Sequence, residues 1–146
     1  MLRGSYTARI DDKGRLKLPT AYKTLVEERH GTSLYVTSLD GKCVLLYPWP
    51  VWLAIEERLG KMPSTHPTRN RYLDRTSFWG QPNEFDAQGR MVVHPMLRDA
   101  AEMSGEVRVI GKVDYLEVWN FDRLKTKLDQ DPFTDDDARI LSDYGI

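Results

Sequence analysis

The sequence predicts an α+β protein, mainly β, built from two tandem copies of one β-β-α-β-β-α unit. A nine-residue motif occurs twice, 75 residues apart: Asp11-Asp12-Lys13-Gly14-Arg15-Leu16-Lys17-Leu18-Pro19 and Asp86-Ala87-Gln88-Gly89-Arg90-Met91-Val92-Val93-His94. An apolar and aromatic stretch follows each copy, at 45–52 and 117–124. Each copy alone is too short to bury a core of its own. The repeats therefore predict one shared core with pseudo-twofold symmetry.

The first copy begins with a strand, a tight turn at Gly14 and a second strand, because Asp and Gly favour turns and Leu16 and Leu18 alternate with polar residues. Apolar residues at helical spacing predict a helix over 20–29. Two further strands, 34–37 and 43–47, flank an Asp40-Gly41 turn. A helix over 50–59 closes the copy.

The second copy repeats this order, with its turn at Gly89 and a β-rich run over 91–93. We expect a helix from Pro95 to Met103, strands at 107–110 and 116–119, and a helix over 122–128 with Asp122 as its N-cap. Between the copies lie a loop over 61–67 and a basic helix over 68–78. Residues 131–146 are predicted to be frayed, or a short helix.

These elements predict four segments, namely repeat 1 (5–52), a helical linker (53–80), repeat 2 (81–124) and an acidic tail (125–146). The net charge is only −1, but it is unevenly spread. Basic side chains gather in 1–23 and 58–75, and aspartates gather in 129–146. This asymmetry predicts a basic face and a tail that points away from any polyanion.

Cys43 is the only cysteine, so no disulfide can form within the chain, and its apolar neighbours indicate a buried small side chain. We expect a cytoplasmic protein, since no apolar signal core and no membrane-spanning run are evident. Trp49, Trp52 and Trp119 lie in apolar runs and are interpreted as core or interface residues. Trp79 has no such setting, and its role stays open.

Arg15 and Arg90 are the candidate binding residues, because each follows a turn glycine. A guanidinium can fork onto the edge of guanine or pair with phosphate. Arg9, Lys13 and Lys17 would add phosphate contacts near Arg15. The alternative is structural: each Arg would pair with the Asp four residues before it, Asp11 or Asp86, and pin the turn. The residue chemistry alone favours neither reading.

The two motifs resemble the paired signatures of the MraZ family. The first is Asp11-x-Lys13-Gly14-Arg15-Leu16-x-Leu18-Pro19, and the second runs from Asp86 through Gln88-Gly89-Arg90 to Pro95-x-Leu97-Arg98. The resemblance covers about residues 2–125 and also includes Arg3-Gly4, 39–41, 45–48 and 118–119. One such turn alone would suggest only the wider AbrB/SpoVT/MazE group.

The resemblance implies a swapped-hairpin AbrB-like barrel formed by the two repeats of one chain. It also implies a nucleoid-associated transcription regulator that binds repeated short G-rich boxes of double-stranded DNA, in the promoter of the division and cell-wall gene cluster, as a ring-shaped homo-oligomer. Arg15 takes the place of the DNA-reading arginine, and Arg90 is its counterpart. Lys13, Gly14, Arg9, Lys17, Gln88 and Gly89 complete the expected interface, with Asp11 and Asp86 shaping the turns.

Two positions depart from the repeat pattern. His94 stands where the first copy has Pro19, so the second strand is expected to end less sharply. Gln88 replaces Lys13, so the second turn carries less charge and should bind DNA more weakly.

Two other classes of function compete with this reading. One is an antitoxin-like interaction module that masks a partner through the acidic tail. The other is a pseudo-symmetric hydrolase that pairs Asp11 with Asp86. The three histidines have no metal-ligand spacing, and no phosphate-binding or nucleophile motif is present. We therefore expect no catalytic residue, metal, cofactor, small-molecule substrate or membrane partner.

Overall fold

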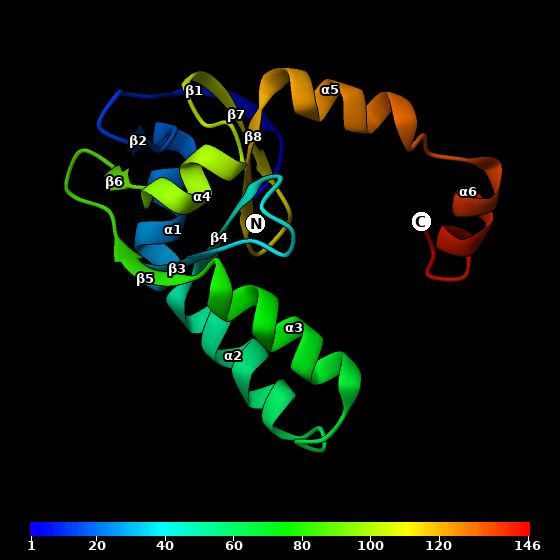
Figure 1. Ribbon diagram of the computed structural model, residues 1–146. Coiled ribbons are helices and arrows are strands. Elements are labelled where there is room, and N and C mark those ends of the chain that lie inside the picture. Colours follow the sequence, from blue (N-terminus) through cyan, green and yellow to red (C-terminus); the bar gives the residue numbers. More distant parts are fainter.

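Eight antiparallel strands form one nearly closed, barrel-like sheet, and six helices lie around it in a computed structural model that describes residues 1–146 (Figure 1). The strands are β1 Ser5–Ile10, β2 Arg15–Lys17, β3 Ser33–Thr37, β4 Val44–Pro48, β5 Gln81–Glu84, β6 Arg90–Val92, β7 Gly105–Gly111 and β8 Leu116–Asn120. The helices are α1 Thr20–His30, α2 Trp49–Gly60, α3 Pro67–Phe78, α4 Pro95–Ala100, α5 Phe121–Gln130 and α6 Asp135–Ser142. The predicted α+β architecture of two β-β-α-β-β-α repeats is confirmed.

The two repeats exchange strands. The order in the sheet is β5-β3-β4-β8-β7-β1-β2-β6. Strand β1 of the first repeat pairs with β7 of the second, and β5 of the second pairs with β3 of the first. The equivalent strands β2 and β6 pair with each other, as do β4 and β8. This reciprocal pairing gives the molecule its pseudo-twofold symmetry, and neither repeat has a complete sheet without the other.

The sheet closes where β5 and β6 meet. These strands are its two ends and are not neighbours in the hydrogen-bonded ladder. The Asn83 side chain nevertheless donates to the carbonyl of Val92 at 2.7 Å, and the amide of Asp86 donates to the carbonyl of Arg90. The Asn83 side chain thus takes the place of one backbone hydrogen bond between β5 and β6. As a result, few backbone groups at this end of the sheet are left unpaired.

One core lies inside the barrel and is shared by both repeats, as predicted. Leu16 and Met91 face each other across β2 and β6 and are buried at its centre. A second, smaller cluster lies outside β4 and β8, under α2, and contains Trp52 and Trp119. The interpretation of these two tryptophans as core residues is confirmed.

The remaining aromatic and sulfur side chains also serve packing. Trp49 is only partly buried and meets Tyr35 edge-on, with ring centroids 6.3 Å apart. Trp79 packs against the main core and covers Gly41. Cys43 is buried in the second cluster, and burial raises the pKa of its thiol to about 12. It is a small packing residue, as expected, and a poor nucleophile.

Two helix boundaries differ from the prediction. Asp122 is not the N-cap of α5; it lies in the first turn, and the side chain of Asn120 caps the helix by accepting the amide of Arg123 at 3.1 Å. The helix begins directly after β8, so its cap falls on the last strand residue. Helix α4 ends at Ala100 rather than Met103, since Glu102 has a positive φ of 53° that ends the helix.

Two projections leave the barrel (Figure 1). One is the antiparallel pair α2 and α3, and the other is α5 followed by α6, the short helix in the tail. Helix α6 is better defined than a frayed end, because Thr134 and Asp137 form a capping box at its start. None of the helices has the length and apolar character needed to span a membrane.

Candidate nucleic-acid interface

The two repeated turns have the same hydrogen-bond geometry. Asp11 accepts the amides of Lys13 and Arg15 at 3.0 and 2.9 Å, while Asp86 accepts those of Gln88 and Arg90, both at 2.9 Å. The turn glycines that follow, Gly14 and Gly89, have φ angles of +80° and +79°, which only glycine adopts without strain. The backbone amides of Arg15 and Arg90 lower the pKa of Asp11 and Asp86 respectively, so both carboxylates are ionised and hold their turns.

The two arginines differ in what their side chains do. Arg15 donates from Nε to Asp11 at 2.7 Å, so the structural pairing considered for it does occur. Half of the Arg15 side chain remains exposed, and the guanidinium forms no other hydrogen bond. Arg90 forms no ion pair with Asp86, so the structural alternative considered for it does not occur. Both guanidinium groups therefore remain accessible to a ligand.

The short strands β2 and β6 place three cations on one exposed face, which we name the basic ribbon: Arg15, Lys17 and Arg90. Lys17 lies directly opposite Arg90 in the register, while Leu16 and Met91 point into the core. Neither Lys17 nor Arg90 has an ion-pair partner. Like charges opposite each other destabilise a sheet, and a bound anion would relieve that repulsion.

The two turns lie at opposite ends of the basic ribbon. Because β2 and β6 are antiparallel and Arg15 pairs with Val92, the turn before Arg15 projects past one end and the turn before Arg90 past the other. Each carboxylate is engaged by its own turn, so Asp11 and Asp86 do not converge on a common point. The paired-aspartate site of the hydrolase alternative is therefore not formed, and no cluster of three metal-ligating side chains occurs elsewhere.

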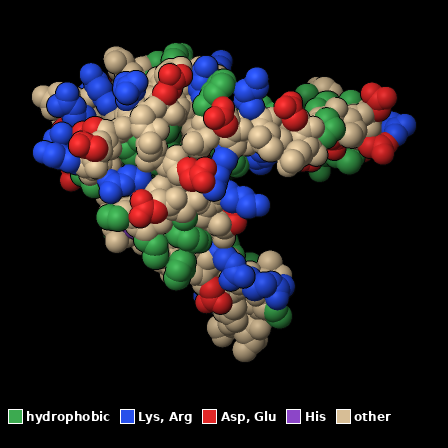
Figure 2. Space-filling view, turned by 45° about the horizontal axis from the view of Figure 1, so that its top comes forward, with side chains coloured by type: hydrophobic (Ala, Val, Ile, Leu, Met, Phe, Trp, Pro, Cys, Tyr) green, Lys and Arg blue, Asp and Glu red, His purple; other side chains and the backbone are tan.

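The other expected contact residues vary in their surroundings. Lys13 and Gln88 are exposed in the two turns. Arg9 is exposed on β1, but its register partner on β7 is Glu106, which offsets its charge. Figure 2 shows Lys and Arg side chains gathered over the end of the body where Figure 1 places β2 and β6.

Sequence reasoning missed two further cations at the turns. Arg98 of α4 lies over Gly14, and Lys23 of α1 lies over Gly89. Each helix thus covers the turn of the other repeat, and both glycines are buried although they lie in turns. The charge of Lys23 also lowers the pKa of Asp86. The signal was present in the sequence, because Lys23 and Arg98 are separated by the same 75 residues as the motifs.

The turns are tied to each other's repeat by the backbone as well. The amide of Val93 donates to the carbonyl of Gly14 at 2.9 Å, and that of Leu18 donates to the carbonyl of Gly89 at 2.8 Å. The spacing of the two turns is therefore fixed by the barrel. Such a surface can present two arginine-bearing loops at a constant separation to a regular, repeating polyanion.

Comparison of the sequence with those of known proteins identifies its family. A family profile described as "MraZ protein, putative antitoxin-like" matches residues 1–75 and 81–143. A protein named Transcriptional regulator MraZ from Koribacter versatilis is 44% identical over 147 residues, and one of the same name from Acidobacterium capsulatum is 38% identical over 146, with all of both chains covered in each case. A further one from Escherichia coli O127:H6 is 33% identical over 121 residues, which cover 82% of this chain and 80% of the relative. The chain belongs to the MraZ family.

Proposed function

We propose that this chain is a sequence-specific, DNA-binding transcription regulator that lays the basic ribbon and its two turns against double-stranded DNA. The observation that carries the proposal is the pairing of Lys17 with Arg90 across β2 and β6, with Arg15 beside them. Of the three cations only Arg15 forms an ion pair, with Asp11. The names of the relatives support the same class of function.

The roles of the residues differ within this proposal. Arg15 is oriented by Asp11, which leaves part of its guanidinium free to donate to the acceptors N7 and O6 of guanine. Lys17 and Arg90 neutralise phosphates between the turns, and Lys13, Arg9 and Gln88 make outer contacts. Gly14 and Gly89 supply the positive φ that shapes the two turns, while Asp11 and Asp86 keep them rigid.

The finer part of the proposal concerns the target and the assembly. A single basic ribbon has few cations, so one copy should bind one short site weakly. Several copies in a ring, each on one of several repeated G-rich boxes in the promoter of the division and cell-wall genes, would gain roughly 10²–10⁴ in apparent affinity from multivalency. The protein would act in the cytoplasm at the nucleoid, without catalysis or a cofactor.

Selection of bound fragments from a random DNA library tests this function directly. We expect a short G-rich box to be enriched, and a gel shift of that box to weaken when Arg15 is replaced by Ala. The matched control is Arg71→Ala, which removes the same side chain from an exposed position on helix α3. Enrichment of no sequence, or equal binding by the Arg15 variant, would contradict the proposal.

A further inference from the structure

The C-terminal arm, residues 131–146, has an apolar face with no partner in its own chain. No residue of α6 is buried, and the side chains of Phe133, Ile140 and Tyr144 are 69%, 59% and 77% exposed. Every hydrogen bond and ion pair of the arm is internal or returns to the end of α5. The arm is therefore connected to the barrel by the polypeptide backbone and makes no hydrogen bond or ion pair with it.

The arm nevertheless has the properties of a docking helix. Thr134 and Asp137 cap its start, and three aspartates occupy its first turn, where the helix dipole favours negative charge. Ile140 and Leu141 lie on one side of the helix, and Ser142 lies on the other. Helices of eight residues are not stable alone in water, so a helix of this kind needs a surface to pack against.

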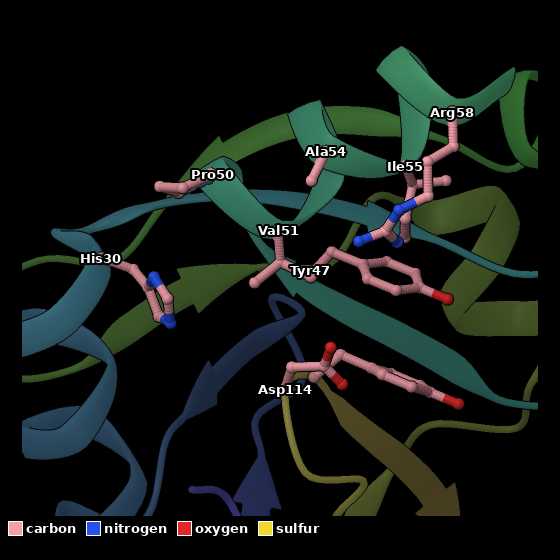
Figure 3. Close-up of a pocket in the computed structure, with 9 residues that line it drawn as sticks. His30, Tyr47, Pro50, Val51, Ala54, Ile55, Arg58 and Asp114 are labelled. Carbon is pink, nitrogen blue, oxygen red and sulfur yellow. The ribbon is translucent and has the colours of Figure 1, made fainter. Parts of the chain in front are cut away.

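A complementary surface exists at α2. The α2 groove has a volume of about 360 Å³ and is lined by His30, Tyr47, Pro50, Val51, Ala54, Ile55, Arg58, Asp114 and Tyr115. Tyr47 and Tyr115 stack at 4.7 Å between ring centroids. Figure 3 shows Val51 and Tyr47 between His30 at one side and Arg58 at the other.

The groove continues into a second hollow that shares His30 and Asp114. Apolar side chains, including Leu25 and Val26, line this hollow together with Arg29. The combined surface is apolar with Arg29, His30 and Arg58 at its edges and one carboxylate, Asp114. The arm has the opposite character, since an apolar face is flanked by Asp135, Asp136, Asp137 and Asp143, and its one cation, Arg139, is paired with Asp136.

The arm and the groove of one chain are poorly placed to meet. The first turn of α5 is anchored on the body by Leu124, which is buried, and by Arg123, which donates to the carbonyl of Ala100 at 2.8 Å. From there α5 leads away from the barrel, and α6 lies beyond its far end, on a different side from α2 (Figure 1). The four residues between the helices span at most about 14 Å. A groove on another molecule is therefore the natural site for the arm.

We propose that the C-terminal arm of one copy docks in the α2 groove of a second copy, with Ile140 and Leu141 inward and the aspartates toward Arg58 and Arg29. This proposal rests on the homo-oligomer proposed under Proposed function and identifies the surfaces through which neighbouring copies would touch. Arm and groove are different surfaces, so the association is heterologous, and repeated heterologous contacts close into a ring when the rotation allows it.

Engineered disulfides test whether the contact is made between molecules. Ala54→Cys is combined with Ile140→Cys, and the matched control combines Ala54→Cys with Ser142→Cys on the other side of α6. Under mild oxidation we expect covalent multimers on a non-reducing denaturing gel for the first pair and monomers for the control. Cys43 is buried and should not contribute. A faster-moving cross-linked monomer, or no cross-link in either pair, would overturn the proposal.

Light scattering on the full chain gives an independent test. Ile140→Asn with Leu141→Asn, and deletion after Gln130, should each lower the mass of the assembly, whereas Ser142→Asn should not. Arg58→Glu should weaken the assembly more than Lys61→Glu, which makes the same charge change outside the groove. An unchanged assembly mass in the arm variants would overturn this contact. A monomeric full-length chain would overturn it too, and the arm would then be a docking helix for a different protein.

The same samples separate this contact from DNA recognition. Arm variants that form smaller assemblies but still prefer the selected box would support the contact and leave the proposed function intact. If Arg15 variants no longer bind the box but form assemblies of unchanged mass, Arg15 acts in DNA binding and not in the contact between copies.

Discussion

Asp11 and Asp86 hold identical turns, but their arginines differ. Arg15 is fixed by an ion pair with Asp11, while Arg90 faces Lys17 and has no partner. An arginine that is already oriented loses less entropy when it binds a base edge. This difference suggests that Arg15 reads bases while Arg90 mainly attracts phosphate.

Replacing Arg15 with Ala should reduce specific DNA binding by about 1–3 kcal/mol for each box, because the variant cannot form a bidentate hydrogen bond to guanine. Arg90→Ala should have a smaller effect, and it should weaken unrelated sequences as much as the selected box. Titration of both DNAs by fluorescence anisotropy distinguishes the two roles. A uniform loss for Arg15→Ala, with no change in box preference, would contradict a base-reading role.

The turn carboxylates also make the folding stability depend on pH. Backbone amides lower the pKa of Asp86 in the folded protein from its ordinary value of 3.8. The stabilisation is therefore complete above that value and is lost as the pH falls through the lower, folded pKa. Asp86→Asn keeps an acceptor but cannot titrate, so its unfolding free energy should fall less steeply below about pH 4 than that of the wild type. Urea unfolding at a series of pH values measures this; parallel curves would contradict it.

At the scale of elements, each helix after a turn covers the turn of the other repeat. Arg98 of α4 packs over Gly14 so closely that a Cβ there would collide with the guanidinium. The positive φ of Gly14 favours glycine, and the Arg98 guanidinium would have to move to make room for any side chain there. The turn, the helix and the exchanged strands thus form one unit.

Gly14→Ala should therefore destabilise the protein more than Gly105→Ala. Both glycines have positive φ, +80° and +65°, but a Cβ at Gly105 would meet open space. The left-handed conformation alone costs about 1–2 kcal/mol, and the collision adds to it at Gly14. Adding Arg98→Ala should recover part of the Gly14→Ala loss, measured as a double-mutant cycle by urea unfolding. Purely additive effects would show that the collision is relieved by other means.

Local patterns predicted most of the elements but not which strands meet. The alternation of Leu16 and Leu18 and the Asp40-Gly41 turn act over a few residues, so the strands around them were predictable. The pairing of β1 with β7 joins Ser5 to Ile110, and only the family resemblance implied such an exchange. Asn120 is hard to predict as a cap because it is also the last residue of β8.

The candidate site was predictable to a similar degree. The repeated motif predicted that Arg15 and Arg90 directly follow two equivalent turns, and they are the first residues of β2 and β6. It did not indicate that Lys17 would lie opposite Arg90, since that depends on the register of β2 and β6. Lys23 and Arg98 were missed because packing between repeats, rather than sequence proximity, brings them to the turns.

At the scale of the whole molecule, Lys and Arg side chains gather at the turn end of the barrel, and the tip of the arm carries mainly acidic side chains with one basic one (Figure 2). An acidic arm beside a duplex would be repelled by phosphate. The arrangement suits a protein that meets DNA with one end and another copy of itself with the other.

Affinity for the selected box should therefore fall steeply with salt, and Lys17→Ala should reduce the slope of log affinity against log salt by about 0.9 for each phosphate that the variant no longer neutralises. Lys125→Ala on α5 is the matched control and should leave the slope unchanged. Truncation after Gln130 should leave the selected sequence unchanged, because the proposed DNA interface does not include the arm. A slope near zero in the wild type would show that phosphates are not neutralised.

The exchange of strands also bears on how the protein is made. Strand β1 leaves the ribosome early, but its partner β7 lies about 100 residues later, a delay of roughly 5–20 s at ordinary rates of synthesis. Until then the growing chain has an unpaired strand and half of a core. Folding must therefore await nearly the whole chain, and its high contact order should make it slow. By the same reasoning, a chain cut in the loop between α2 and α3 should still assemble from its two fragments, because the barrel needs both halves but not their covalent link.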